Sequence, residues 1–120
     1  MKAYQPICEV LSNGTRLVYL RVPSQVAHLG FFFAAGSRHE GPNQIGLAHF
    51  LEHLMFTGTA LVPKIDTILQ NAGASNNAFT SSDITSYYEV LPKENYELAL
   101  CIEADRMQNL AFDKTAFETQ

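Results

Sequence analysis

The sequence has few of the residues that mark several large classes of protein. Its 120 residues include two cysteines, no tryptophan, and 8 lysines and arginines against 12 acidic residues. Cys8 and Cys101 are too few for a disulfide framework or a cysteine-based zinc site, and we expect both thiols to be buried. The basic residues form no cluster, which argues against nucleic acid as a partner. The longest apolar runs, such as residues 29–35, fall short of the roughly 18 residues that a membrane-spanning helix needs.

The N-terminal residues 1–9 lack the continuous apolar segment of a secretory signal. A chain that starts at Met1 is therefore predicted to stay in the cytoplasm. Hydrophobic residues make up 47% of the sequence and charged residues 17%, which is typical of a globular domain. Residues 1–120 contain no internal repeat or linker and are treated as one unit. A helical pattern from Asp113 has no closing cap before Gln120, which predicts that the chain covers part of a domain.

Strand patterns and helix patterns occur in groups along the chain. Strands are predicted at residues 7–11, 16–22, 26–35, 74–80 and 84–91. The first two should form a hairpin with a two-residue Asn-Gly turn, and the third should be buried on both faces. Helices are predicted at residues 44–56, capped by Asn43, and at residues 63–71, 93–110 and from 113 onwards. The third of these should bury a face made of Tyr96, Ala99, Leu100, Met107 and Leu110.

The helix predicted at residues 44–56 is apolar on nearly all sides, which predicts that it is buried. Its strongly polar side chains are His49, Glu52 and His53. Because a helix turns by about 100° per residue, Glu52 lies about 60° to one side of His49 and His53 about 40° to the other. The three side chains therefore share one narrow stripe, where unpaired polar groups would cost several kcal/mol.

This stripe has the chemistry of a metal site. Histidines four residues apart can present two nitrogens to one tetrahedral zinc ion, and Glu52 can then act as general base toward water at the metal. The order His-x-x-Glu-His is the inverzincin pattern, which arises by chance in about one such sequence in a hundred. The residues alone leave two alternatives open. The histidines can hydrogen-bond to each other or to a nearby carboxylate, or they can store metal without hydrolysis.

Three segments around this motif resemble the pitrilysin-type inverzincin metallopeptidases, the family of insulin-degrading enzyme and the mitochondrial processing peptidase. They are Gly36-Ser37-Arg38 with GLAHFLEHLMFTGT at residues 46–59, NAFTSSDITSYY at residues 77–88, and LSNGTRL at residues 11–17. The resemblance covers the whole chain. It implies an α+β fold, an antiparallel sheet with helices packed on one face, forming the front half of one domain at residues 1–120.

The resemblance also implies a function. The chain would be the N-terminal fragment of a zinc endopeptidase that cleaves extended or unfolded peptides, with His49 and His53 as zinc ligands and Glu52 as general base. The third ligand would be a glutamate near position 128, beyond the chain, so the fragment alone should be inactive or weak. Family members often have an acidic residue where Gln120 stands here. The expected partners are a peptide substrate and the remaining domains of the parent protein or a homologous subunit.

Residues 74–79 resemble the edge strand to which the family adds a substrate peptide, with Asn77, Ala78 and Phe79 as substrate-binding residues. Asn77 could instead stabilise a turn at residues 75–76. Glu103 could serve as a third ligand within this chain, or it could form an ion pair with Arg106, which we favour. A different class of function stays open, a non-catalytic subunit of the same fold that binds peptides or supports assembly.

Overall fold

The computed structural model describes residues 4–112 and 114–119. Its elements in chain order are β1 (Ile7–Val10), β2 (Arg16–Tyr19), β3 (Val26–Phe33), η1 (Ser37–His39), α1 (Leu47–Leu54), α2 (Ile65–Asn71), β4 (Ser75–Thr80), β5 (Thr85–Pro92), η2 (Lys93–Asn95), α3 (Tyr96–Asn109) and α4 (Lys114–Thr119). Asp113 and Gln120, which carried two of the sequence-based expectations, lie outside the described residues.

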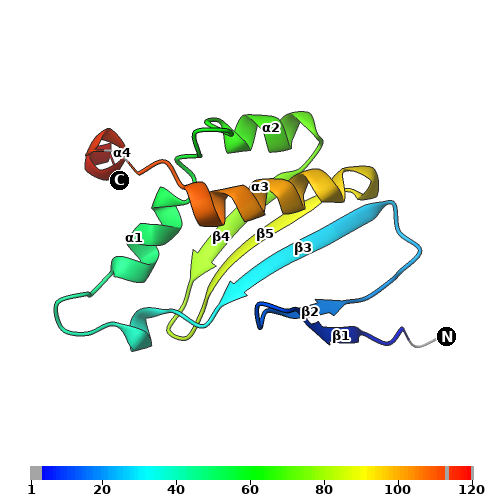
Figure 1. Ribbon diagram of the computed structural model, residues 1–120, viewed down its shortest axis with the longest axis horizontal. Coiled ribbons are helices and arrows are strands. Elements are labelled where there is room, and N and C mark those ends of the chain that lie inside the picture. Colours follow the sequence, from blue (N-terminus) through cyan, green and yellow to red (C-terminus); the bar gives the residue numbers. More distant parts are fainter. Residues whose placement is uncertain (1–3, 113, 120) are drawn as a thin grey trace.

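The main sheet has the order β3-β5-β4, and both pairs are antiparallel. Helices α2 and α3 pack together against one face of this sheet, and α1 lies beside β4 (Figure 1). Strands β1 and β2 form a separate antiparallel hairpin. The predicted α+β class, with helices on one face of an antiparallel sheet, is therefore confirmed.

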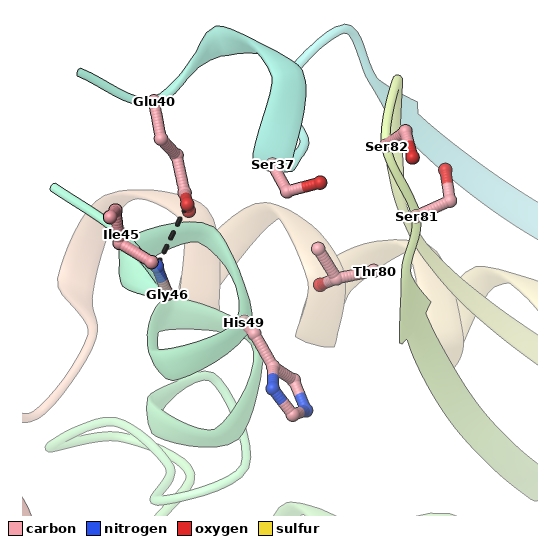
Figure 2. A pocket seen from close by; sticks show the side chains of 8 residues that line it. All are labelled: Ser37, Glu40, Ile45, Gly46, His49, Thr80, Ser81 and Ser82. Atoms are coloured by element: carbon pink, nitrogen blue, oxygen red, sulfur yellow. Dashed lines mark hydrogen bonds between the residues drawn. The ribbon is translucent and has the colours of Figure 1, made fainter. Parts of the chain in front are cut away.

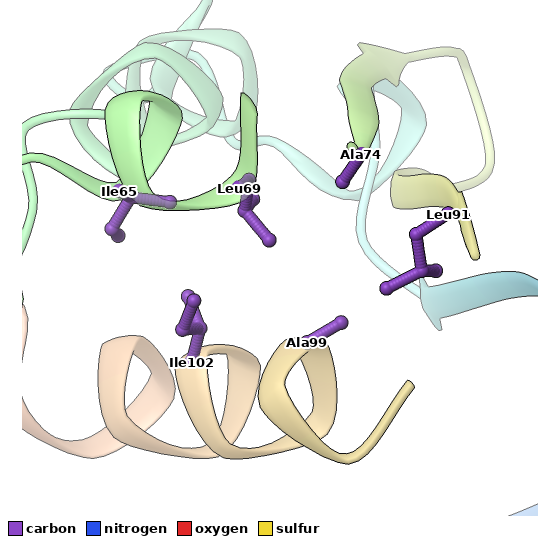
Figure 3. Close-up of a cluster of buried hydrophobic side chains, with 6 residues drawn as sticks. All are labelled: Ile65, Leu69, Ala74, Leu91, Ala99 and Ile102. Carbon is purple, nitrogen blue, oxygen red and sulfur yellow. The ribbon is translucent and has the colours of Figure 1, made fainter. Parts of the chain in front are cut away.

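The hydrophobic core lies between α2, α3 and the sheet. Its buried members are Ile65, Leu69, Ala74, Leu91, Ala99 and Ile102 (Figure 3). Leu69 and Ala99 are both 0% exposed, and the small Ala99 side chain leaves room for Leu91 of the sheet to approach α3. This packing fixes β4 and β5 as a rigid support for the residues that follow.

The turn of the N-terminal hairpin differs from the predicted one. Leu11 donates its N–H to the carbonyl of Thr15 at 2.8 Å, so three residues rather than two connect the strands. Gly14 has a φ of +85°, whereas no non-glycine residue within the described ranges has a positive φ. Asn13 instead uses its side chain to accept the N–H of Thr15 at 3.0 Å. The wider loop with one left-handed glycine replaces a two-residue turn, which would need positive φ at both positions.

Three predictions of burial were wrong. The first concerned β3, because helices cover only one face of the sheet in the described part of the chain. Strand β3 alternates between exposed and half-buried residues, and Phe32 on the uncovered face is 68% exposed. Helix α1 also packs on one side only, and its Leu47 is 54% exposed. Cys8 and Cys101 are both exposed free thiols, contrary to the expectation that they are buried.

The buried face of α3 also differs from the predicted one. Its buried residues are Ala99, Ile102, Glu103 and Arg106, whereas Tyr96, Leu100 and Met107 are exposed. The buried positions keep helical spacing, but two of them are charged, so an apolar pattern could not reveal them. No helix in residues 4–112 and 114–119 is long and apolar enough to cross a membrane.

Candidate active site

The two histidines of the motif lie side by side on α1. The Nε2 atoms of His49 and His53 are 3.1 Å apart, and their ring centroids are 4.7 Å apart. Two zinc–nitrogen bonds of about 2.0–2.1 Å at a tetrahedral angle place their nitrogens about 3.3 Å apart. The pair therefore fits two ligand positions around one zinc ion. The same separation also suits a hydrogen bond between a neutral imidazole donor and a neutral imidazole acceptor.

Glu52 lies on the inner side of the same helix and is 9% exposed. Its Oε2 accepts a hydrogen bond at 2.5 Å from the hydroxyl of Thr80, the last residue of β4. Thr85, which pairs with Thr80 across the sheet, donates its own hydroxyl to the carbonyl of Ala35 at 2.8 Å. This arrangement fixes the carboxylate beside the histidine pair. No hydrogen bond from the described residues reaches its Oε1 atom, which leaves that oxygen able to accept a proton.

Within residues 4–112 and 114–119, no third His, Cys, Asp or Glu joins His49 and His53 in a group that could hold a metal ion. Glu103, the alternative ligand, forms an ion pair with Arg106 instead. Arg106 donates from Nε and Nη2 to Glu103 Oε2 at 3.0 and 2.7 Å, and both side chains are almost fully buried. The favoured interpretation of Glu103 is therefore confirmed. A third ligand beyond residue 120 stays a prediction.

Arg106 joins α3 to the end of α1. It lies 4.7 Å from the ring centroid of Tyr87 and 5.5 Å from that of Phe56, and its Nη1 donates to the carbonyl of Met55 at 3.5 Å. Met55 is the C-cap of α1. A cation at this end of the helix is electrostatically favourable because the helix dipole is negative there.

Sequence reasoning also missed the buried carboxyl group of Glu89, which is 1% exposed on β5. Burial, followed by a hydrogen bond and repulsion from Glu103, raises the pKa of Glu89 to about 9, while the charge of Arg106 lowers it. Glu89 therefore carries a proton at neutral pH, which leaves Glu103 to pair with Arg106. Burial also raises the pKa of Tyr87 to about 12.

Strand β4 pairs only with β5 in the described part of the sheet, so its other edge is open. The three predicted substrate-binding residues lie on this strand: Asn77 and Phe79 are exposed, and Ala78 is half-buried on the helix side. The N–H of Ala78 donates to the side chain of its neighbour Asn77 at 2.8 Å, so it points away from β5. The alternative role of Asn77 at a turn was wrong, because residues 75–76 belong to the strand.

A cavity of about 500 Å³ opens beside His49 (Figure 2). It lies between the start of α1 and the turn that joins β4 to β5. Its lining residues are Ser37, Glu40, Ile45, Gly46, His49, Thr80, Ser81 and Ser82. Of the two histidines, His49 lines the cavity, together with four small hydroxyl side chains, Ser37, Thr80, Ser81 and Ser82.

The start of α1 differs from the prediction that Asn43 caps a helix at residues 44–56. The helix begins at Leu47, and its N-cap is Gly46 with a φ of +88°. Glu40 accepts the N–H groups of both Gly46 and Ala48 at 2.8 Å, and these two hydrogen bonds lower the pKa of Glu40. Sequence reasoning missed this residue because it lies outside the helix, six positions before Gly46.

Comparison with known proteins shows to which family the chain belongs. The sequence matches the model of the family described as Insulinase (Peptidase family M16) over residues 16–120. The chain belongs to this M16 family. The family expected from the motif and its flanking segments is thereby confirmed.

Relatives of this M16 chain include proteases from eukaryotes and bacteria. It is 39% identical over 113 residues to mitochondrial-processing peptidase subunit beta of Dictyostelium discoideum, covering 92% of this chain and 24% of the relative. It is 34% identical over 111 residues to an uncharacterized zinc protease of Bacillus subtilis, covering 90% of this chain and 27% of the relative. The M16 chain thus spans about a quarter of the length of these curated relatives.

The same M16 chain also superposes on a solved structure, that of a protease from Helicobacter pylori, with a TM-score of 0.91 and 29% sequence identity. The match covers 98% of this chain and 29% of the solved chain. The fold described above is therefore part of a larger protease structure in that relative.

Proposed function

We propose that this M16 chain is the part of a zinc endopeptidase that supplies two metal ligands, the general base and the substrate-binding strand. One observation carries the proposal. The Nε2 atoms of His49 and His53 are 3.1 Å apart beside the buried carboxylate of Glu52. A purely structural role would not require two exposed imidazoles side by side, on the same helix as a carboxylate that the Thr80 hydroxyl holds in place.

His49 and His53 would hold the zinc ion, which supplies Lewis-acid chemistry to a peptide carbonyl and to water. Glu52 takes a proton from the attacking water and later gives it to the amine of the departing peptide. The Thr80 hydroxyl, 2.5 Å from Glu52 Oε2, holds the carboxylate in one orientation, so that the other oxygen is the one that exchanges the proton.

The substrate would be an extended or unfolded peptide, added as a further strand to the open edge of β4. Backbone hydrogen bonds would hold it with little regard for its side chains. The outward N–H of Ala78 would donate to the peptide once Asn77 releases it, and Asn77 and Phe79 would contact the substrate from the uncovered face. Adding a strand here satisfies backbone groups that are otherwise left to solvent.

The rest of the site would come from outside the chain. We propose that residues 1–120 are a partial N-terminal metallopeptidase domain, and that a glutamate in the sequence following residue 120 is the third ligand. The remaining domains, or a homologous subunit, would enclose the peptide. The curated relatives are about four times as long as this chain, which supports further domains. A cytoplasmic location stays a prediction.

A second candidate is a non-catalytic subunit that binds peptides or supports assembly. The open edge of β4 favours it, because strand addition needs no metal. The two candidates predict the same peptide binding but differ in hydrolysis.

Substitution of Glu52 distinguishes them in the complete gene product. Glu52→Gln keeps the shape of the side chain but removes the proton acceptor, so peptide cleavage should fall by at least about a hundredfold with zinc still bound. Cleavage of an unstructured fluorogenic peptide and zinc content by elemental analysis give the two readouts. Glu9→Gln, on the exposed hairpin, is the matched control. Equal cleavage by wild type and Glu52→Gln would overturn the assigned base.

A further inference from the structure

The loop that precedes α1 is tied to the helix by one side chain, Glu40. Its Oε2 accepts the N–H of Gly46 and its Oε1 accepts the N–H of Ala48, both at 2.8 Å. The first N–H groups of an α-helix have no partner within the helix, and a side chain at the N-cap usually supplies one. Here the N-cap is Gly46, which has no side chain, so Glu40 takes over that role from six residues away.

This contact matters most for His49, the third residue of α1. The other two motif residues are held elsewhere: Glu52 is buried against Thr80, and His53 lies in the last turn. His49 is exposed, and the hydrogen-bond partner of its side chain among the described residues is His53. Because helix ends fray, the position of His49 depends on the first turn staying helical.

The first turn of α1 can unwind easily because the residue before it is a glycine. Gly46 enters it with a φ of +88°, a conformation that glycine adopts freely and can also leave freely. Hydrogen bonds from Glu40 on both sides of Leu47 restrict this freedom. The negative carboxylate is also favourable at the positive end of the helix dipole.

We propose that Glu40 is a positioning residue for the metal site. By holding the first turn of α1, it keeps His49 Nε2 at a separation from His53 Nε2 that a shared cation requires. Glu40 acts through the backbone of Gly46 and Ala48, and it is itself neither a ligand nor a catalytic residue. This inference rests on the proposed zinc-binding function.

The test uses Glu40→Gln and Glu40→Ala in the complete gene product. Glutamine keeps the size of the side chain but replaces one acceptor oxygen with an NH₂ donor, so one of the two backbone N–H groups loses its partner. Alanine removes both acceptors. Zinc affinity, measured by competition with a chromophoric chelator, should weaken about fivefold in Glu40→Gln and more in Glu40→Ala.

Hydrogen exchange in the metal-free protein supplies an independent readout. The peptide covering residues 41–50 should exchange faster in both variants, while peptides from α3 should be unchanged. Glu9→Gln removes an exposed glutamate from the hairpin and should match wild type in both measurements.

The possible failures point to different hypotheses. A wild-type protein that binds no zinc overturns the proposed function itself. Zinc binding by wild type with the same affinity in Glu40→Ala overturns only the role of Glu40, whether or not exchange at residues 41–50 changes. Weaker zinc binding with unchanged exchange at residues 41–50 also overturns it, because Glu40 would then act by another route.

Discussion

The carboxylate of Glu52 accepts a hydrogen bond from the hydroxyl of Thr80 at 2.5 Å, and this contact joins helix α1 to the end of β4. The same strand provides the open edge that we propose for the substrate. The separation between the general base and the bound peptide would therefore depend on how α1 packs against β4.

Loss of the Thr80 hydroxyl should impair catalysis without loss of zinc. Thr80→Val keeps the shape of the side chain but leaves Glu52 without its hydrogen-bond donor, and a contact of this kind typically contributes about ten- to a hundredfold in activity. We expect kcat for peptide cleavage to fall by that factor while zinc content stays the same. Thr67→Val, at an exposed position of α2, is the matched control. An unchanged kcat in Thr80→Val would contradict the role of the hydroxyl.

Loss of a histidine ligand should remove the metal. His49→Ala takes away one of the two imidazole donors, and we expect the dialysed protein to contain much less zinc than wild type by elemental analysis. His28→Ala is the control, because His28 is an exposed residue of β3 with no ligand partner at metal spacing. Retention of the wild-type zinc content by His49→Ala would show that the metal binds elsewhere.

Stability should fall as the pH rises because of Glu89. Its pKa is raised from about 4.5 to about 9 in the folded protein, so between these values the folded state keeps a proton that the unfolded state releases. The stabilisation is complete below about pH 4.5 and is lost as the pH rises toward about 9. Glu103 and Arg106 are the charged groups that act on it.

Glu89→Gln tests this pH dependence, because glutamine stays neutral at every pH. The free energy of unfolding, measured by chemical denaturation at several values between pH 5 and pH 9, should decline less steeply in the variant than in wild type. Glu9→Gln should keep the wild-type slope, since Glu9 is exposed. Parallel curves for wild type and Glu89→Gln would rule out Glu89 as the source.

The core between α2 and α3 should be sensitive to lost volume. Leu69 is 0% exposed, so Leu69→Ala should lower the free energy of unfolding by about 2–5 kcal/mol. Leu61→Ala removes the same atoms at a position that is 78% exposed and should change it by less than about 0.5 kcal/mol. Denaturant unfolding of both variants measures the difference, and similar effects at the two sites would contradict the assigned core.

Local patterns predicted which elements form but not how their surfaces are covered. The strand with three successive phenylalanines was predicted to be buried on both faces, yet Phe32 is 68% exposed. A hydrophobic side chain tends to be buried. Whether it is buried depends on whether another helix or strand packs on its face of the sheet. For the same reason, α3 buries Glu103 and Arg106, which neutralise each other, while the apolar Leu100 stays exposed.

The stripe of His49, Glu52 and His53 could be predicted from residue spacing, because helix geometry is local and residues three and four apart share a face. The family also followed from the sequence, through the motif and similar segments spread over residues 11–88. Two other contacts became visible in the folded chain: Glu52 meets Thr80, 28 residues away, and Arg106 reaches Met55, 51 residues away. Such contacts depend on the packing of separate elements against one another, which no spacing along the chain specifies.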